Sequence, residues 1–149
     1  MEVSQSFILQ EFVNEDIYNR LGNNAIWVLD PKIIKVAQKI RYHFDSPMYI
    51  NTWVFRGKGK RLQWRGFRPS LYTKCAYFSQ HKMGRAIDFS IDGVTPEEVQ
   101  EELKKVQKSI GFSAMEVGTP TWTHVDIRNQ MTNKPLYINH KVSKAIKVV

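Results

Sequence analysis

The stretch FSQHKMGRAIDFSID, residues 78–92, joins a turn to a short strand. From residue 86 onward, its side chains alternate with the period of two that is typical of a strand with one buried face. One face carries Ile87, Phe89 and Ile91, and the other carries Ala86, Asp88 and Ser90. His81 lies in the turn before this strand. From these residues alone, His81 and Asp88 are either two ligands of a metal site or a loop histidine and an ordinary strand carboxylate.

A second alternating stretch, TWTHVDIR at residues 121–128, predicts another strand of this kind. It places Trp122, His124, Asp126 and Arg128 on one face and Thr123, Val125 and Ile127 on the other. If the two strands are neighbours in one sheet, Asp88 and His124 meet on the face opposite the core, and His81 closes over them. Two imidazoles and one carboxylate with a fourth position open form the ligand set of a catalytic zinc site. Zinc lowers the pKa of its bound water from about 15.7 to about 7, which supplies hydroxide at neutral pH.

The remaining patterns predict an α+β fold. Helices are predicted over residues 31–44 and 96–110, and more weakly over 6–20, and further strands over 46–55, 113–117 and 134–139. Asp30 and Thr95 can cap the two clear helices. This order indicates a small antiparallel sheet packed with helices, with the metal site on the open face of the sheet. At 149 residues the chain has room for one core, so we expect a single domain over residues 1–149.

The basic residues are concentrated in the middle of the chain. The net charge of +8 favours a polyanionic partner, which could be nucleic acid, an anionic cell wall or a membrane surface. Between residues 47 and 87 there is no Asp or Glu, and aromatic residues are interleaved with basic ones. The basic residues of this segment are Arg56, Lys58, Lys60, Arg61, Arg65, Arg68, Lys74, Lys82 and Arg85.

The single cysteine, Cys75, excludes an internal disulfide and a cysteine-based zinc site. Any metal must therefore use His, Asp or Glu. The other two histidines, His43 and His140, are expected to have no metal role. The N-terminal residues lack the features of a secretory signal, and no apolar run is long enough to span a membrane. We therefore expect a protein that is cytoplasmic in the producing cell unless other machinery releases it.

The two stretches together resemble a known zinc-binding signature. SQHKMGRAID followed by WTHVDIR is similar to the pattern SxHxxGxAxD plus a downstream His of the D-alanyl-D-alanine carboxypeptidase and L-alanyl-D-glutamate endopeptidase family. The residues that match are Ser79, His81, Gly84, Ala86 and Asp88. The resemblance covers about residues 28 to 128 and is greatest to small phage and prophage peptidases; the hedgehog signalling domain shares the fold of that family.

The resemblance implies a hedgehog-like fold with His81, Asp88 and His124 as ligands of Zn²⁺. It also implies that Gly84 allows the tight turn before the strand and that Ser79 stabilises this turn.

The resemblance leaves the general base open. Many relatives carry an acid three residues before the last ligand, where this chain has Thr121. Glu116 and Asp126 are the candidates. We prefer Glu116, and Asp126 would then orient a ligand histidine.

A substrate that carries free carboxylates also needs an arginine, because a guanidinium grips a carboxylate with two hydrogen bonds. Arg56 corresponds best to the arginine of the family, and Arg65 and Arg68 are the alternatives. Trp53, Trp64, Tyr72 and Trp122 could form walls of the cleft.

The function that the resemblance implies is hydrolysis of an amide bond in the peptide stem of bacterial peptidoglycan, as in an endolysin. The expected partners are the stem peptide and the anionic cell wall, which a monomer would reach by export or lysis. A non-catalytic, metal-stabilised binding domain on the same fold is the alternative. A nucleic-acid binder is a third possibility, suggested by the basic aromatic segment, but it leaves the two histidines and Asp88 unexplained, so no nucleic-acid partner is expected.

Overall fold

The computed structural model describes residues 1–57 and 59–143; Lys58 and residues 144–149 of the basic tail lie outside the described residues. The main helices are α2, Pro31–Phe44, and α3, Pro96–Ile110. Shorter helical elements are η1 (Leu9–Glu11), α1 (Glu15–Leu21), η2 (Gly22–Val28), η3 (Gln80–Met83) and α4 (His140–Ser143). The strands are β1 (Met48–Tyr49), β2 (Ala86–Ile91), β3 (Ala114–Val117), β4 (Thr123–Asp126) and β5 (Leu136–Asn139).

The helix boundaries follow from local chemistry. The Asp30 side chain accepts a hydrogen bond from the backbone N–H of Lys32, at 2.9 Å, which satisfies one free donor at the start of α2. Thr95 and Glu98 form a capping box at the start of α3, and Gly111 ends this helix with a φ of 89°. The two clear helix predictions are therefore confirmed.

The strands form a five-stranded mixed sheet in the order β1-β2-β4-β3-β5. The pairs β1–β2, β2–β4 and β4–β3 are antiparallel, whereas β5 runs parallel to β3. The prediction of an antiparallel sheet is therefore wrong for β5. The reason is the position at which β4 ends. Its last residue, Asp126, pairs with Ala114, the first residue of β3. Leu136, the first residue of β5, pairs with the same Ala114, so β3 and β5 start at the same end of the sheet. The chain thus re-enters the sheet at the starting end of β3.

The strand predicted over residues 46–55 stops after Tyr49. Beyond it, the backbone turns to the N-terminal segment: the N–H of Asn51 donates to the Glu11 carbonyl at 3.1 Å. The Asn51 side chain donates to the Val13 carbonyl at 3.0 Å, and the Trp53 indole donates to the same carbonyl at 2.9 Å. Residues within the alternating stretch 49–54 therefore make hydrogen bonds with residues 11–13 and do not extend the strand.

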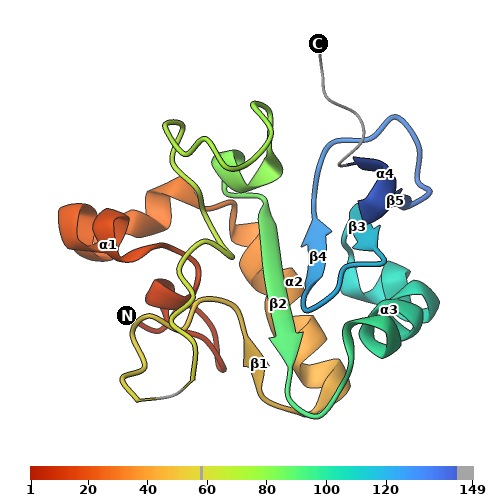
Figure 1. The fold of residues 1–149 in the computed structure, drawn as a ribbon, viewed down its shortest axis with the longest axis horizontal. Coiled ribbons are helices and arrows are strands. Elements are labelled where there is room, and N and C mark those ends of the chain that lie inside the picture. The colour runs from red at the N-terminus through yellow and green to blue at the C-terminus, as the bar shows by residue number, and fades with distance from the viewer. Residues whose placement is uncertain (58, 144–149) are drawn as a thin grey trace.

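The hydrophobic core lies between the helices and one face of the sheet. In Figure 1, α2 crosses behind β2 and β4, and α3 lies beside β3. Fully buried residues of the core include Ile33, Ile40, Ile87, Phe89, Leu103, Met115 and Val125. The opposite face of β2 and β4 is also covered, since Ala86, Asp88 and His124 are each buried. The expected open face is thus partly closed by residues 64–81, which places the candidate site in a cleft.

Candidate metal centre

The register of the sheet brings three polar residues into one row. Asp88 on β2 pairs with His124 on β4, and His124 pairs with Glu116 on β3. Directly opposed residues on neighbouring strands project from the same face of a sheet. The predicted neighbourhood of Asp88 and His124 is therefore confirmed, and Glu116 lies one strand further along.

His81 reaches this row from η3, the short helix before β2. Gly84 ends η3 with a φ of 65°, in the left-handed region. A Cβ at this position would lie 1.9 Å from the Val28 carbonyl oxygen, and the Gly84 carbonyl accepts from the Asp30 N–H at 3.0 Å. The turn is therefore packed so closely against the start of α2 that only glycine fits.

Ser79 takes part in this turn through its backbone and not through its side chain. The side chain makes no capping hydrogen bond with the described residues at the start of η3. The Ser79 carbonyl instead accepts a hydrogen bond from the Lys82 N–H at 3.0 Å.

The three side chains converge on one point. His81 Nε2 lies 3.2 Å from Asp88 Oδ1, His124 Nδ1 lies 2.7 Å from the same oxygen, and the two ring nitrogens are 3.3 Å apart. The residues are 3%, 8% and 7% exposed, respectively. This buried group could hold a metal ion. Two ligand atoms at 2.0–2.1 Å from a tetrahedral zinc lie about 3.3 Å apart. The two separations from His81 Nε2 are close to this value, and the third, between His124 Nδ1 and Asp88 Oδ1, is shorter.

In each histidine, the hydrogen-bond partner of the nitrogen that faces away from Asp88 determines which ring nitrogen carries the proton. His81 Nδ1 lies 2.7 Å from the Gly66 carbonyl oxygen, which can only accept, so Nδ1 carries the hydrogen. His124 Nε2 likewise faces Asp126 Oδ2 at 3.2 Å. In neutral rings, the inner nitrogens then present lone pairs to each other and to Asp88. Three acceptors at these distances repel unless a cation lies among them, and this is the physical reason that the group suits a metal.

Burial and charge set the protonation of the group. Burial lowers the pKa of His81, and the Asp88 charge opposes that shift only in part. Burial would raise the pKa of Asp88, but His81 and His124 hold it well below its ordinary value. Burial would lower the pKa of His124, but its hydrogen bonds to Asp126 and Asp88 raise it to about 10. Without a metal, the positive charge of the group is thus that of a protonated His124, and a metal ion would displace this proton.

Asp126 is turned away from the cleft and is fully buried. Its Oδ1 accepts from the backbone N–H of Arg128 at 3.0 Å and from the guanidinium Nε at 2.8 Å. Burial would raise the pKa of Asp126, but the hydrogen bonds of Arg128 and His124 lower it to about 2. The carboxylate is therefore engaged in orienting His124 and is poorly placed to take a proton from the cleft.

Glu116 faces the cleft and has a partner that the sequence did not indicate. Its Oε2 lies 3.2 Å from His140 Nδ1, and the His140 ring stands edge-on to Trp122, with centroids 5.2 Å apart. The sequence predicts no metal role for His140 and does not indicate this contact with Glu116. One signal could have found it: in LYINH, His140 is in phase with Ile138, which pairs with Glu116 once β5 is known to lie beside β3.

The three candidate arginines occupy different places. Arg68 contacts the metal group, since its Nη2 donates to Asp88 Oδ2 at 2.6 Å. Arg65 lies along β2, where its carbonyl accepts from the Asp88 N–H at 2.7 Å and its Nη1 donates to Ser90 at 3.0 Å. Arg56 is exposed and does not line either cavity beside the metal group in the described structure.

The metal group lies in a cleft of about 540 Å³. Its lining combines cations and aromatic side chains with the acceptors of the site: Arg68, Lys74, Phe78, His81, Asp88, Glu116, Trp122, His124, Arg128 and His140. A neighbouring cavity of about 390 Å³ shares Arg68, Asp88 and Trp122 with it and is also lined by Trp64. Of the aromatic residues expected to form walls of the cleft, Trp122 does so, whereas Trp64 lines only the neighbouring cavity, and Tyr72 stacks on Trp64 at 4.5 Å. Trp53 instead packs near Tyr18.

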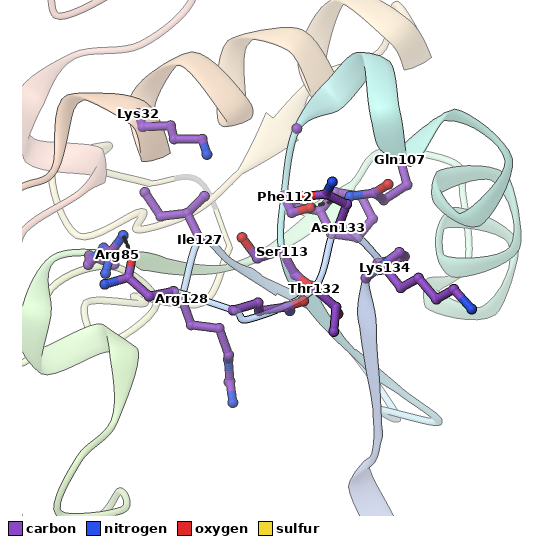
Figure 2. A pocket seen from close by; sticks show the side chains of 14 residues that line it. Lys32, Arg85, Gln107, Phe112, Ser113, Ile127, Arg128, Thr132, Asn133 and Lys134 are labelled. Atoms are coloured by element: carbon purple, nitrogen blue, oxygen red, sulfur yellow. Dashed lines mark hydrogen bonds between the residues drawn. The ribbon is translucent and has the colours of Figure 1, made fainter.

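A further cavity, of about 340 Å³, lies where α2 begins and β4 ends (Figure 2). In Figure 2, Lys32 enters it from α2 above Ile127 and Ser113, whereas Arg128 extends away from Lys32. Among its described lining residues there is no Asp, Glu or His, so this cavity offers no metal ligands. Arg128 lines both this cavity and the cleft.

Comparisons with known proteins identify no family. The chain matches no protein-family model, and neither the curated proteins nor the solved structures include a significant match. Among the described helices, none has the length and apolar character needed to cross a membrane. The family resemblance of the two motifs therefore remains a prediction.

Proposed function

We propose that this protein is a zinc-dependent peptidase that hydrolyses an amide bond in the peptide stem of bacterial peptidoglycan. The observation that carries the proposal is the row of Asp88, His124 and Glu116 in the cleft, closed by His81. Ligands and a proton acceptor on one sheet face are what metal-assisted hydrolysis needs. The similarity of SQHKMGRAID and WTHVDIR to cell-wall peptidases supports the substrate class.

His81 Nε2, Asp88 Oδ1 and His124 Nδ1 would hold the zinc, which supplies a Lewis acid and an acidic bound water when present. Glu116 accepts the proton of the attacking water and delivers it to the leaving amine nitrogen. Asp126 and the Gly66 carbonyl keep the two rings in the orientation that directs their inner nitrogens into the cleft.

The charge of the cleft suits a substrate with free carboxylates. Arg68, Lys74 and Arg128 all line it. Arg68 is already paired with Asp88, and Arg128 with Asp126, so each has only part of its guanidinium available to a substrate. Lys74 has no ion pair in the described structure, which makes it a free cation for a stem carboxylate. The positive surface of the chain favours adsorption to an anionic cell wall.

The test loads purified protein with zinc, measures metal content and identifies by mass the products released from peptidoglycan and from peptides with L-Ala-D-Glu or D-Ala-D-Ala bonds. His81→Ala should lose metal and activity together. His43→Ala is the matched control, because His43 is a partly exposed histidine paired with Glu102 outside the cleft. Equal metal content in His81→Ala and wild type would refute the ligand assignment.

A non-catalytic, metal-stabilised binding domain is the second candidate. It is favoured by Thr121, which stands where many relatives of the family carry an acid, and by the low exposure of the metal group. Full zinc binding without turnover of any of these substrates would support it. A nucleic-acid binder is weaker, because Trp64 and Tyr72 stack on each other and Arg68 is paired with Asp88. Salt-sensitive DNA binding that survives metal removal and a His124 substitution would favour it.

A further inference from the structure

We propose that His140 is a positioning residue that holds Glu116 in the orientation needed for proton transfer. The inference rests on the proposed function, since it assigns a role within that reaction. It concerns a residue 16 positions beyond His124, outside both motifs.

The topology of the sheet brings His140 to the site. The parallel pairing of β5 with β3 sets Ile138 beside Glu116, and the chain turns into α4 at His140. His140 Nδ1 then lies 3.2 Å from Glu116 Oε2. The side chain of His140 is 12% exposed and that of Glu116 is 26% exposed, so the histidine closes the side of the cleft behind the carboxylate.

Trp122 fixes the histidine from a second direction. Its ring meets the His140 ring edge-to-face, at an interplanar angle of 89°. Trp122 comes directly before β4, the strand of His124, so the segment that leads into the strand of a candidate ligand also packs against His140. The imidazole is thus held by packing on one side and by a carboxylate on the other.

This contact gives Glu116 a defined geometry. A glutamate side chain turns about three bonds, and an acceptor must lie within hydrogen-bond reach of the proton that it takes. A donor on Oε2 leaves Oε1 available to the cleft. Removing that donor would let the carboxylate rotate, which lowers the rate of the chemical step more than it affects substrate binding.

The test compares His140→Ala and His140→Asn with the wild type, each as the full chain loaded with zinc. The amide nitrogen of Asn lies close to the position of Nδ1 and can donate the same hydrogen bond. We expect kcat on the stem peptide to fall by about 10- to 100-fold in His140→Ala with little change in KM. His140→Asn should recover most of kcat.

His43→Ala is the matched control, since His43 makes a similar contact with Glu102, at 3.0 Å, and neither residue lines the cleft. It should keep the wild-type kcat. Wild-type kcat in His140→Ala overturns the inference. Loss of zinc from His140→Ala also overturns it, because the residue would then support the metal group rather than Glu116.

A second measurement does not need turnover. Nitrogen-15 NMR of the histidine rings reports which nitrogen of His140 carries the proton in the zinc-loaded protein. We expect Nδ1–H in the wild type and a changed Nδ1 signal in Glu116→Ala; an unchanged signal overturns the contact and the inference. If the contact is present but the wild type hydrolyses no stem peptide, the proposed function fails and the positioning role fails with it.

Discussion

Glu11 should make the protein less stable as the pH rises from 4.5 to about 7. This carboxyl is 6% exposed, and its Oε2 accepts a hydrogen bond from the Ile8 N–H at 3.0 Å. Burial raises its pKa from 4.5 to about 7, and the hydrogen bond opposes this only in part. No basic side chain of the described residues forms an ion pair with it.

The sign follows from proton binding. Between pH 4.5 and pH 7 the folded state holds a proton on Glu11 that the unfolded state has lost, so the free energy of unfolding falls as the pH rises. The contribution is complete below pH 4.5 and absent above pH 7. A pKa change of this size corresponds to about 3 kcal/mol.

Glu11→Gln should remove this dependence, because an amide does not titrate and can still accept from Ile8. Urea unfolding of both proteins at several pH values between 4 and 8, with chelator present, gives the two free energies of unfolding. We expect the variant to gain about 3 kcal/mol relative to wild type between pH 4 and pH 8. Other titrating groups are common to both proteins and cancel in the difference. A difference that does not change with pH would refute the reasoning.

Three further predictions concern the metal group. Gly84→Ala should lower the free energy of unfolding by about 2–4 kcal/mol in urea titrations, because its Cβ would lie 1.9 Å from the Val28 carbonyl oxygen. Gly93→Ala is the control, since φ is also positive at Gly93 but a Cβ there would meet no other part of the chain within 4 Å. Asp126→Asn should weaken zinc binding by about 10- to 100-fold in chelator competition, because His124 loses its charged acceptor; unchanged affinity would contradict that role. Zinc binding should strengthen as the pH rises towards 10 and should release about one proton near neutral pH, because the pKa of His124 is raised to about 10. Calorimetry in buffers of different ionisation enthalpy would show the proton release. A zinc affinity that does not change with pH would contradict this prediction.

The sequence predicted those parts of the site that depend on short-range patterns. Strand alternation placed Asp88 and His124 on the face opposite the core, and the register of β2 and β4 agrees. The capping residues Asp30 and Thr95 gave the starts of both long helices because capping is a local interaction.

Features that depend on distant segments were missed. The parallel course of β5 is set by where β4 ends, and no pattern within residues 134–139 encodes it. The contact of His140 with Glu116 depends on this course of β5. The preference for Arg56 rests on its correspondence to the arginine that follows a strand in the family, but the strand here ends at Tyr49, and Arg68, one of the two alternatives, is the arginine at the metal group. These positions follow from tertiary packing, which local spacing does not report.

The close packing at Gly66 shows that the N-terminal residues support the metal group. A Cβ there would lie 2.1 Å from the Phe12 carbonyl oxygen, and the N–H of Phe67 donates to that oxygen at 2.7 Å. The Gly66 carbonyl, in turn, is what His81 Nδ1 meets. Residues 9–13 thus pack against the segment that orients His81, a candidate ligand, although the motif resemblance begins near residue 28. A shortened chain that keeps both motifs but starts after residue 14 would keep all three ligand side chains and lose the surface that orients one of them.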